Sequence, residues 1–97
     1  MLNELRNEIY DDAVKHGLWD CVSHLDNEEG RIASGHAIWR EVLELLAEYE
    51  RPGRYAEELA DVIIMSLSVA GYLGIDIDKA VRRKMEINRG REWRHGK

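Results

Sequence analysis

The stretch from residue 55 to residue 73 constrains the fold of this chain more than any other part of it. Its second half, Val62–Leu73, is about 12 residues long and is apolar at nearly every position, so a helix there needs cover on every side. It is too short to cross a membrane, which takes about 20 apolar residues. Because the chain has only 97 residues, part of the cover is expected from a second copy. The sequence therefore predicts a homodimer or a dimer of dimers, with no membrane partner.

Hydrophobic spacing and turn residues predict four helices in one domain. Asp76 is placed to cap the last helix, and Gly74 is placed to end the helix before it. Pro52 and Gly53 mark a short turn, which makes the helices on either side of it antiparallel neighbours. Residues 17–30 are rich in turn-forming residues and are predicted to be a loop. The first three predicted helices cover about residues 2–16, 31–50 and 55–73, and the fourth follows its cap, Asp76, and runs to about residue 89. The predicted fold is a single all-α domain over residues 1–97, arranged as a four-helix bundle.

Charge is distributed unevenly along the chain. Residues 82–97 carry seven basic and two acidic side chains, whereas residues 1–81 carry seven basic and seventeen acidic ones. An acidic body with a basic end suits a protein that binds metal cations and an anionic substrate, although a solvated basic terminus explains the same pattern. Cys21 is the only cysteine, which fits a reducing compartment, and the charged first residues do not resemble a secretory signal. We therefore expect a cytoplasmic protein.

Two pairs of acidic residues are predicted to meet across the turn. Glu41 and Glu44 are three residues apart on one predicted helix, and Glu58 and Asp61 are three apart on the next, so each pair shares a helix face. The alternative interpretation is two solvated helix faces, but apolar residues flank both pairs. Carboxylates that converge in such surroundings repel one another unless a cation neutralises them. Oxygen ligands without histidine or cysteine favour Mg²⁺, with Mn²⁺ as a substitute.

Two further features could contact an anionic or aromatic ligand. Lys84, Asn88 and Arg91 follow one another at intervals of four and three, so they share one face and could hold phosphate oxygens. The alternative for this group is an exposed polar face. Trp19 follows a glycine in the predicted loop, where it could stack on a nucleobase or simply pack against the body.

In combination, these motifs resemble the all-α nucleotide pyrophosphohydrolase superfamily. The order Glu41-Val-Leu-Glu44, then 13 residues, then Glu58-Leu-Ala-Asp61 is similar to its ExxE–ExxD signature. Within the superfamily the chain looks most like the small MazG-like proteins. The segments that resemble that family are residues 15–20, 57–62, 73–76, 83–91 and 95–97.

The resemblance implies a fold, a reaction and a role for each motif. The fold would be a four-helix unit that dimerises. The four acidic residues would be catalytic and would coordinate Mg²⁺, with Glu41 or Glu44 accepting a proton, and Lys84, Asn88 and Arg91 would contact the phosphates. Water would attack the α-phosphorus of a nucleoside triphosphate, giving the monophosphate and pyrophosphate, as in nucleotide-pool housekeeping.

Substrate and partners follow from the same resemblance. The substrate would be a free nucleotide and not a nucleic-acid polymer. Two alternatives stay open: a dUTP or dCTP pyrophosphatase of the same superfamily, and a non-catalytic helical interaction or regulatory module.

Overall fold

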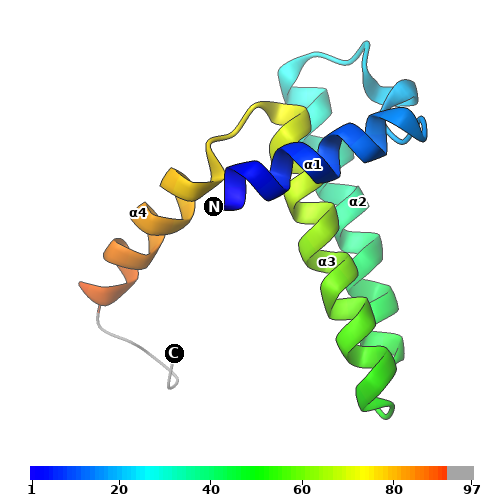
Figure 1. Cartoon of the computed structure of the whole chain (residues 1–97), viewed down its shortest axis with the longest axis vertical. Helices are drawn as coiled ribbons and strands as arrows, with labels where there is room; N and C mark the ends of the chain where they lie inside the picture. The colour runs from blue at the N-terminus through cyan, green and yellow to red at the C-terminus, as the bar shows by residue number, and fades with distance from the viewer. Residues whose placement is uncertain (92–97) are drawn as a thin grey trace.

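The computed structural model describes residues 1–91, and this part of the chain contains helices and no strands. Four α-helices and one short 3₁₀ helix follow one another along the chain (Figure 1). They are α1 (Leu2–Lys15), η1 (Asp20–Val22), α2 (Asn27–Ala47), α3 (Pro52–Leu73) and α4 (Ile77–Arg89). The predicted all-α class and the predicted number of helices are confirmed for this range.

The start of α2 differs from the prediction, because the helix begins at Asn27 and not near residue 31. Asp26 and Glu29 form a capping box: the Asp26 carboxylate accepts from the Glu29 N–H at 2.8 Å, and the Glu29 carboxylate accepts from the Asp26 N–H at 3.3 Å. Gly30, interpreted from the sequence as a loop residue, therefore lies within α2. A Cβ there would be 2.8 Å from the Tyr72 hydroxyl oxygen, so this position needs a glycine.

The start of α3 also differs from the prediction. Pro52 is the first residue of α3 rather than part of the turn before it. Proline suits this position because the first residues of a helix have no intrahelical partner for their N–H groups. The turn between α2 and α3 consequently falls before Pro52. At the other end of α3, the predicted stop at Gly74 is confirmed by the left-handed backbone of that glycine, with φ +68°.

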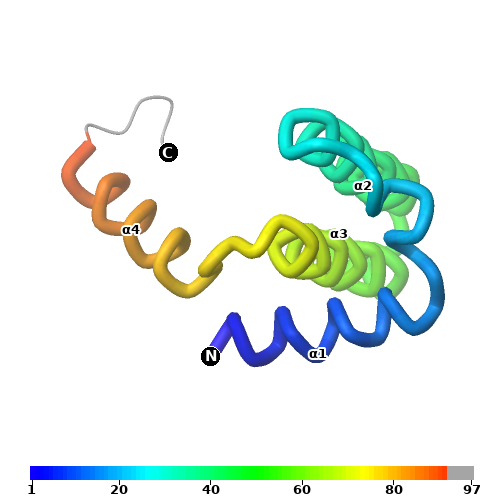
Figure 2. The backbone as a smooth tube through the Cα atoms, turned by 90° about the horizontal axis from the view of Figure 1, so that it is seen from above, coloured from blue at the N-terminus to red at the C-terminus, as the bar shows by residue number. Residues whose placement is uncertain are grey.

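The core forms where three helices meet. α2 and α3 run antiparallel as a hairpin, and α1 packs across the C-terminal half of α3 (Figures 1 and 2). The buried apolar residues of the described chain come from α2, from α3 and from the segment between α1 and α2. They are Trp19, Ala37, Leu45, Leu67, Val69 and Ala70.

α4 extends away from the three packed helices α1, α2 and α3. Its axis is turned by 114° from that of α3, and its main contacts are with α1 (Figures 1 and 2). Within one chain, three helices therefore pack together while the fourth extends away, so the predicted four-helix arrangement is found only in part. No single helix in residues 1–91 is long and apolar enough to cross a membrane; only the bent pair α3 and α4, taken together, meets that length and composition.

The contact between α1 and α3 depends on a small residue at position 71. A Cβ at Gly71 would lie 2.6 Å from the Cβ of Tyr10, which is closer than two nonbonded carbon atoms can approach. We expect Gly71→Ala to lower the free energy of unfolding by up to about 2 kcal/mol, because overpacking costs about 1–3 kcal/mol and alanine offsets roughly 1 kcal/mol of this through its higher helix propensity. Urea denaturation measures the change.

Gly35 provides the matched control. It also lies within a helix, but a Cβ there would meet no atom within 4 Å. Gly35→Ala is therefore expected to raise the free energy of unfolding by up to about 1 kcal/mol. Equal stabilisation by both substitutions would contradict the close approach of α1 at Gly71.

Candidate active site

Three of the four predicted carboxylates converge where α2 lies against α3. One carboxylate oxygen from each of Glu41, Glu44 and Glu58 lies within 4.8 Å of the others, and we call these three residues the carboxylate cluster. Glu41 and Glu44 lie on successive turns of α2, and Glu58 lies in the first half of α3, so the antiparallel hairpin brings them together. Asp61, about one turn further along α3, is exposed and is not among the residues whose oxygens converge.

The surroundings of the cluster disfavour negative charge. Burial raises the pKa of Glu41, and a hydrogen bond to the Glu44 carboxyl and the charges of Asp61 and Glu58 raise it further. Burial also raises the pKa of Glu58, followed by the charge of Asp61. The influence of Asp61 on both groups shows that it lies close enough to act with the cluster electrostatically. A cation at this point would be stabilised by all four carboxylates.

The donor atoms fit a hard divalent cation. Glu58 Oε2 is buried and has no hydrogen-bond partner among the described residues, and such an orphaned oxygen costs free energy. Within the same range no lysine or arginine forms an ion pair with the cluster. The nearest ion pair in the sequence joins Glu48 to Arg51, in the turn between α2 and α3, at 2.9 Å. The cluster offers only carboxylate oxygens, which are the ligands that Mg²⁺ and Mn²⁺ prefer.

Comparison with known proteins identifies the family of the chain. Residues 36–96, well over half of the chain, match the MazG-like family. The chain belongs to the MazG-like family. The matched range contains all of α3 and the part of α2 that carries Glu41 and Glu44, and it confirms the resemblance to this family.

One curated relative adds a named activity. This MazG-like chain is 50% identical, over 36 residues, to a dATP/dGTP diphosphohydrolase of Cyanophage S-2L. The aligned region is 37% of this chain and 34% of the relative, so the match spans about a third of the relative's length. No solved structure matches the chain.

The predicted phosphate-binding residues of the MazG-like chain lie apart from its cluster: Lys84 and Asn88 share a face of α4, and Arg91 follows the end of that helix. The Arg91 guanidinium donates to Asn88 Oδ1 at 3.4 Å, and Lys84 and Arg91 are both exposed. Because α4 turns away from α3, the structure does not bring this group to the carboxylates of the same chain (Figure 1).

Of the two interpretations of Trp19, the structure shows the packed one. It is only 6% exposed, and its indole N–H donates to Ser68 Oγ at 2.9 Å. Its ring stacks on Tyr72, with centroids 4.4 Å apart and planes 5° apart, and the Tyr72 hydroxyl donates to the Val22 carbonyl at 2.8 Å. The sequence signal for this contact was the spacing of Ser68 and Tyr72, which share one face of α3.

A cavity of about 300 Å³ lies between α1 and α3. Ile64 and Met65 contribute to its wall from α3, one turn beyond Asp61, and Ile9 contributes from α1. His16 stands at the end of α1 and adds a polar group to the mostly apolar lining. Apolar walls with a few polar groups are typical of pockets for small organic molecules.

The raised pKa values predict how the metal-free protein responds to pH. A carboxyl group whose pKa in the folded protein exceeds its ordinary value of 4.5 favours the folded state fully below pH 4.5. This contribution to stability is lost as the pH rises through the pKa of the folded state. Glu58→Gln should therefore raise the thermal unfolding midpoint in the presence of a chelator at pH 7.5, and the gain should shrink toward pH 4.5. Calorimetry across this pH range provides the measurement.

Glu8→Gln is the control for that experiment, since Glu8 is exposed on α1. It should leave the unfolding midpoint nearly unchanged at both pH values. A midpoint for Glu58→Gln that equals or falls below that of the unsubstituted protein at pH 7.5 would show that the carboxylates do not repel one another.

Proposed function

We propose that this MazG-like chain hydrolyses nucleoside triphosphates to the monophosphate and pyrophosphate, with Mg²⁺ as cofactor and Mn²⁺ as a substitute. The observation that carries this proposal is the convergence of Glu41, Glu44 and Glu58 around a buried oxygen without a partner. The name of the curated relative, dATP/dGTP diphosphohydrolase, supports a purine deoxynucleotide as the substrate. A role in nucleotide-pool housekeeping follows from such a reaction.

The carboxylate cluster, together with Asp61, would hold the cation. When bound, Mg²⁺ supplies positive charge against the phosphate oxygens and lowers the pKa of bound water. Glu41 or Glu44 accepts a proton from the attacking water, whose oxygen forms the new bond to the α-phosphorus. The bond from that phosphorus to the bridging oxygen breaks, and pyrophosphate leaves. No covalent intermediate with the protein is needed.

The phosphate chain and the nucleoside occupy different parts of the molecule in this proposal. Lys84 and Arg91 offset the negative charge of the phosphates, and the Asn88 amide donates to a phosphate oxygen. The cavity beside Met65 lies one turn of α3 from Asp61 and has apolar walls, so it is the candidate position for the nucleoside.

A panel of nucleotides tests this function. The protein is incubated with Mg²⁺ and with dATP, dGTP, dCTP, dUTP and the ribonucleotides, and the products are separated by chromatography. The monophosphate and pyrophosphate are expected, most rapidly from the purine deoxynucleotides. Preference for dUTP or dCTP would favour the pyrimidine-specific alternative. A diphosphate with orthophosphate would contradict the reaction, and no turnover of any nucleotide would favour the non-catalytic interaction module.

A further inference from the structure

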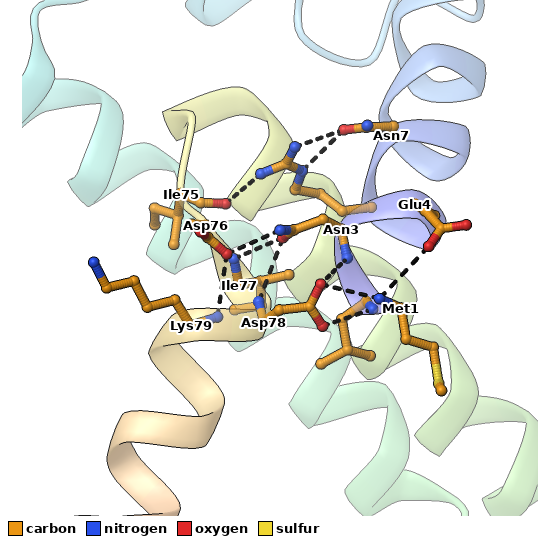
Figure 3. A network of polar contacts seen from close by, with 11 residues as sticks. Met1, Asn3, Glu4, Asn7, Ile75, Asp76, Ile77, Asp78 and Lys79 are labelled. Carbon is orange, nitrogen blue, oxygen red and sulfur yellow. Dashed lines mark hydrogen bonds and ion pairs between the residues drawn. The ribbon is translucent and has the colours of Figure 1, made fainter.

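The N-terminal ends of α1 and α4 cap each other (Figure 3). Asp78 in the first turn of α4 accepts from the backbone N–H groups of Leu2, at 2.8 Å, and of Asn3, at 3.0 Å. In return, the Asn3 side-chain oxygen accepts from the Ile77 N–H at 2.9 Å, and its amide donates to Asp76 at 2.8 Å. Each helix thus satisfies N–H groups at the start of the other, which would otherwise lack partners. We call the hydrogen bonds among these five residues the interlock.

Polar contacts, and not apolar packing, hold α4 in its direction. Neither α1 nor α4 contains a buried residue, and the main contacts of α4 within residues 1–91 are with α1. The Arg6 guanidinium of α1 donates to the carbonyl of Ile75, in the segment between α3 and α4, and so adds a polar contact at the same junction. The direction of α4 therefore depends on a small number of hydrogen bonds.

Both carboxylates of the interlock are charged at neutral pH. The backbone N–H groups of Asn3 and Leu2 hold the pKa of Asp78 below its ordinary value, and the Asn3 amide does the same for Asp76. Hydrogen bonds to a charged acceptor are roughly twice as strong as those between neutral groups. The interlock is therefore closed at the pH at which the proposed reaction would be assayed.

α4 carries side chains that the proposed function assigns to the phosphates. Lys84 and Asn88 are four residues apart on this helix, and the direction of α4 sets their places, whichever copy's carboxylate cluster they serve. A helix of 13 residues is about 20 Å long, so turning α4 by about 10° at its start would move its far end by about 3 Å. A misplacement of about 1 Å is enough to cost up to about 100-fold in rate.

We propose that Asn3, Asp76 and Asp78 are positioning residues of the reaction, which fix the direction of α4 through the interlock. They act through Lys84 and Asn88 and do not touch the substrate themselves. The catalytic consequence rests on the proposed function, whereas the fixed direction of α4 does not. A purely structural role would instead affect the stability of the fold and leave the kinetics of the folded protein unchanged.

Spin labels test the fixed direction without an activity readout. In a Cys21→Ser background, Glu8→Cys on α1 and Glu86→Cys on α4 carry the labels, since both positions are exposed. Labelled chains are diluted with an excess of unlabelled chains, so that only distances within one chain are measured. One narrow distance distribution is expected, and Asp78→Ala should broaden it, whereas Asp11→Ala, which removes an exposed carboxylate from α1, should not. An equally narrow distribution in Asp78→Ala would overturn the proposal.

A double-mutant cycle tests whether this direction matters to the reaction. Asp78→Ala should lower kcat/KM for dATP or dGTP by about 10–100-fold, because the phosphate contacts are misplaced rather than removed. In that background Lys84→Ala should cost less than about threefold, against about 10–1,000-fold on its own, since a lysine on an unfixed helix has already lost most of its effect. Residues that do not touch normally act additively within about twofold. Equal losses from Lys84→Ala in the two backgrounds would therefore overturn the positioning role.

A second variant separates positioning from stability. Asn3→Ala breaks the interlock from the other helix and should reproduce both effects of Asp78→Ala, whereas Asp11→Ala should produce neither. Kinetics are measured well below the unfolding midpoint of each variant, so that loss of folded protein does not contribute. Lowered midpoints with unchanged kinetics in both interlock variants would overturn the positioning role. If the spin labels respond as expected but the unsubstituted protein hydrolyses no nucleotide, the fixed direction of α4 stands and the proposed function fails.

Discussion

Replacing Glu58 with glutamine is expected to remove Mg²⁺ binding and nucleotide hydrolysis together. Glu58 is the only member of the carboxylate cluster that comes from α3, and its buried Oε2 has no partner among the described residues. The amide keeps the size of the side chain but loses the negative charge that a cation requires. We expect turnover to fall by more than about 100-fold, the scale of losing one preorganised electrostatic group. Calorimetric titration with Mg²⁺ and a turnover assay measure the two effects.

Two comparisons make that experiment specific. Asp61→Asn should reduce Mg²⁺ affinity less than Glu58→Gln, because Asp61 is exposed and its oxygens are not among those that converge. Glu8→Gln, on the exposed surface of α1, should change neither quantity. Mg²⁺ affinity and activity like those of the unsubstituted protein in both Glu58→Gln and Asp61→Asn would exclude this cluster as the metal site.

The second large effect is expected on α4. Lys84→Ala should lower kcat by about 10–1,000-fold, because one fixed positive charge against the phosphates is lost. Arg91→Ala should act in the same direction, and Arg82→Ala, on the other side of the helix, should have little effect. Steady-state kinetics with Mg²⁺ distinguish the three variants. Full activity in both Lys84→Ala and Arg91→Ala would show that this face is only a solvated polar surface.

The carboxylate cluster could be predicted from the sequence because its determinants are local. The spacing of Glu41 and Glu44 places them on one helix face, and the turn before Pro52 forces α2 and α3 to run antiparallel. The separate position of Asp61 could not be predicted, since it depends on how far the two helices are rotated against each other.

The features that escaped prediction depend on contacts between distant residues. The environment of Trp19 depends on Ser68, which is 49 residues away along the chain. The direction of α4 depends on the contact between Asn3 and Asp78, which are 75 residues apart. Asp76 could be predicted to cap α4, but its second partner lies in α1. The earlier start of α2 was a different kind of error, because the Asp26-x-x-Glu29 capping box was present in the sequence.

The proposed cleavage between the α- and β-phosphates is tested most directly by hydrolysis in water labelled with ¹⁸O. The protein is incubated with Mg²⁺ and dATP or dGTP, and the products are separated and analysed by mass spectrometry. One labelled oxygen in the nucleoside monophosphate, with unlabelled pyrophosphate, is the expected result, because water attacks the α-phosphorus. Label in pyrophosphate, or release of a nucleoside diphosphate with orthophosphate, would contradict it.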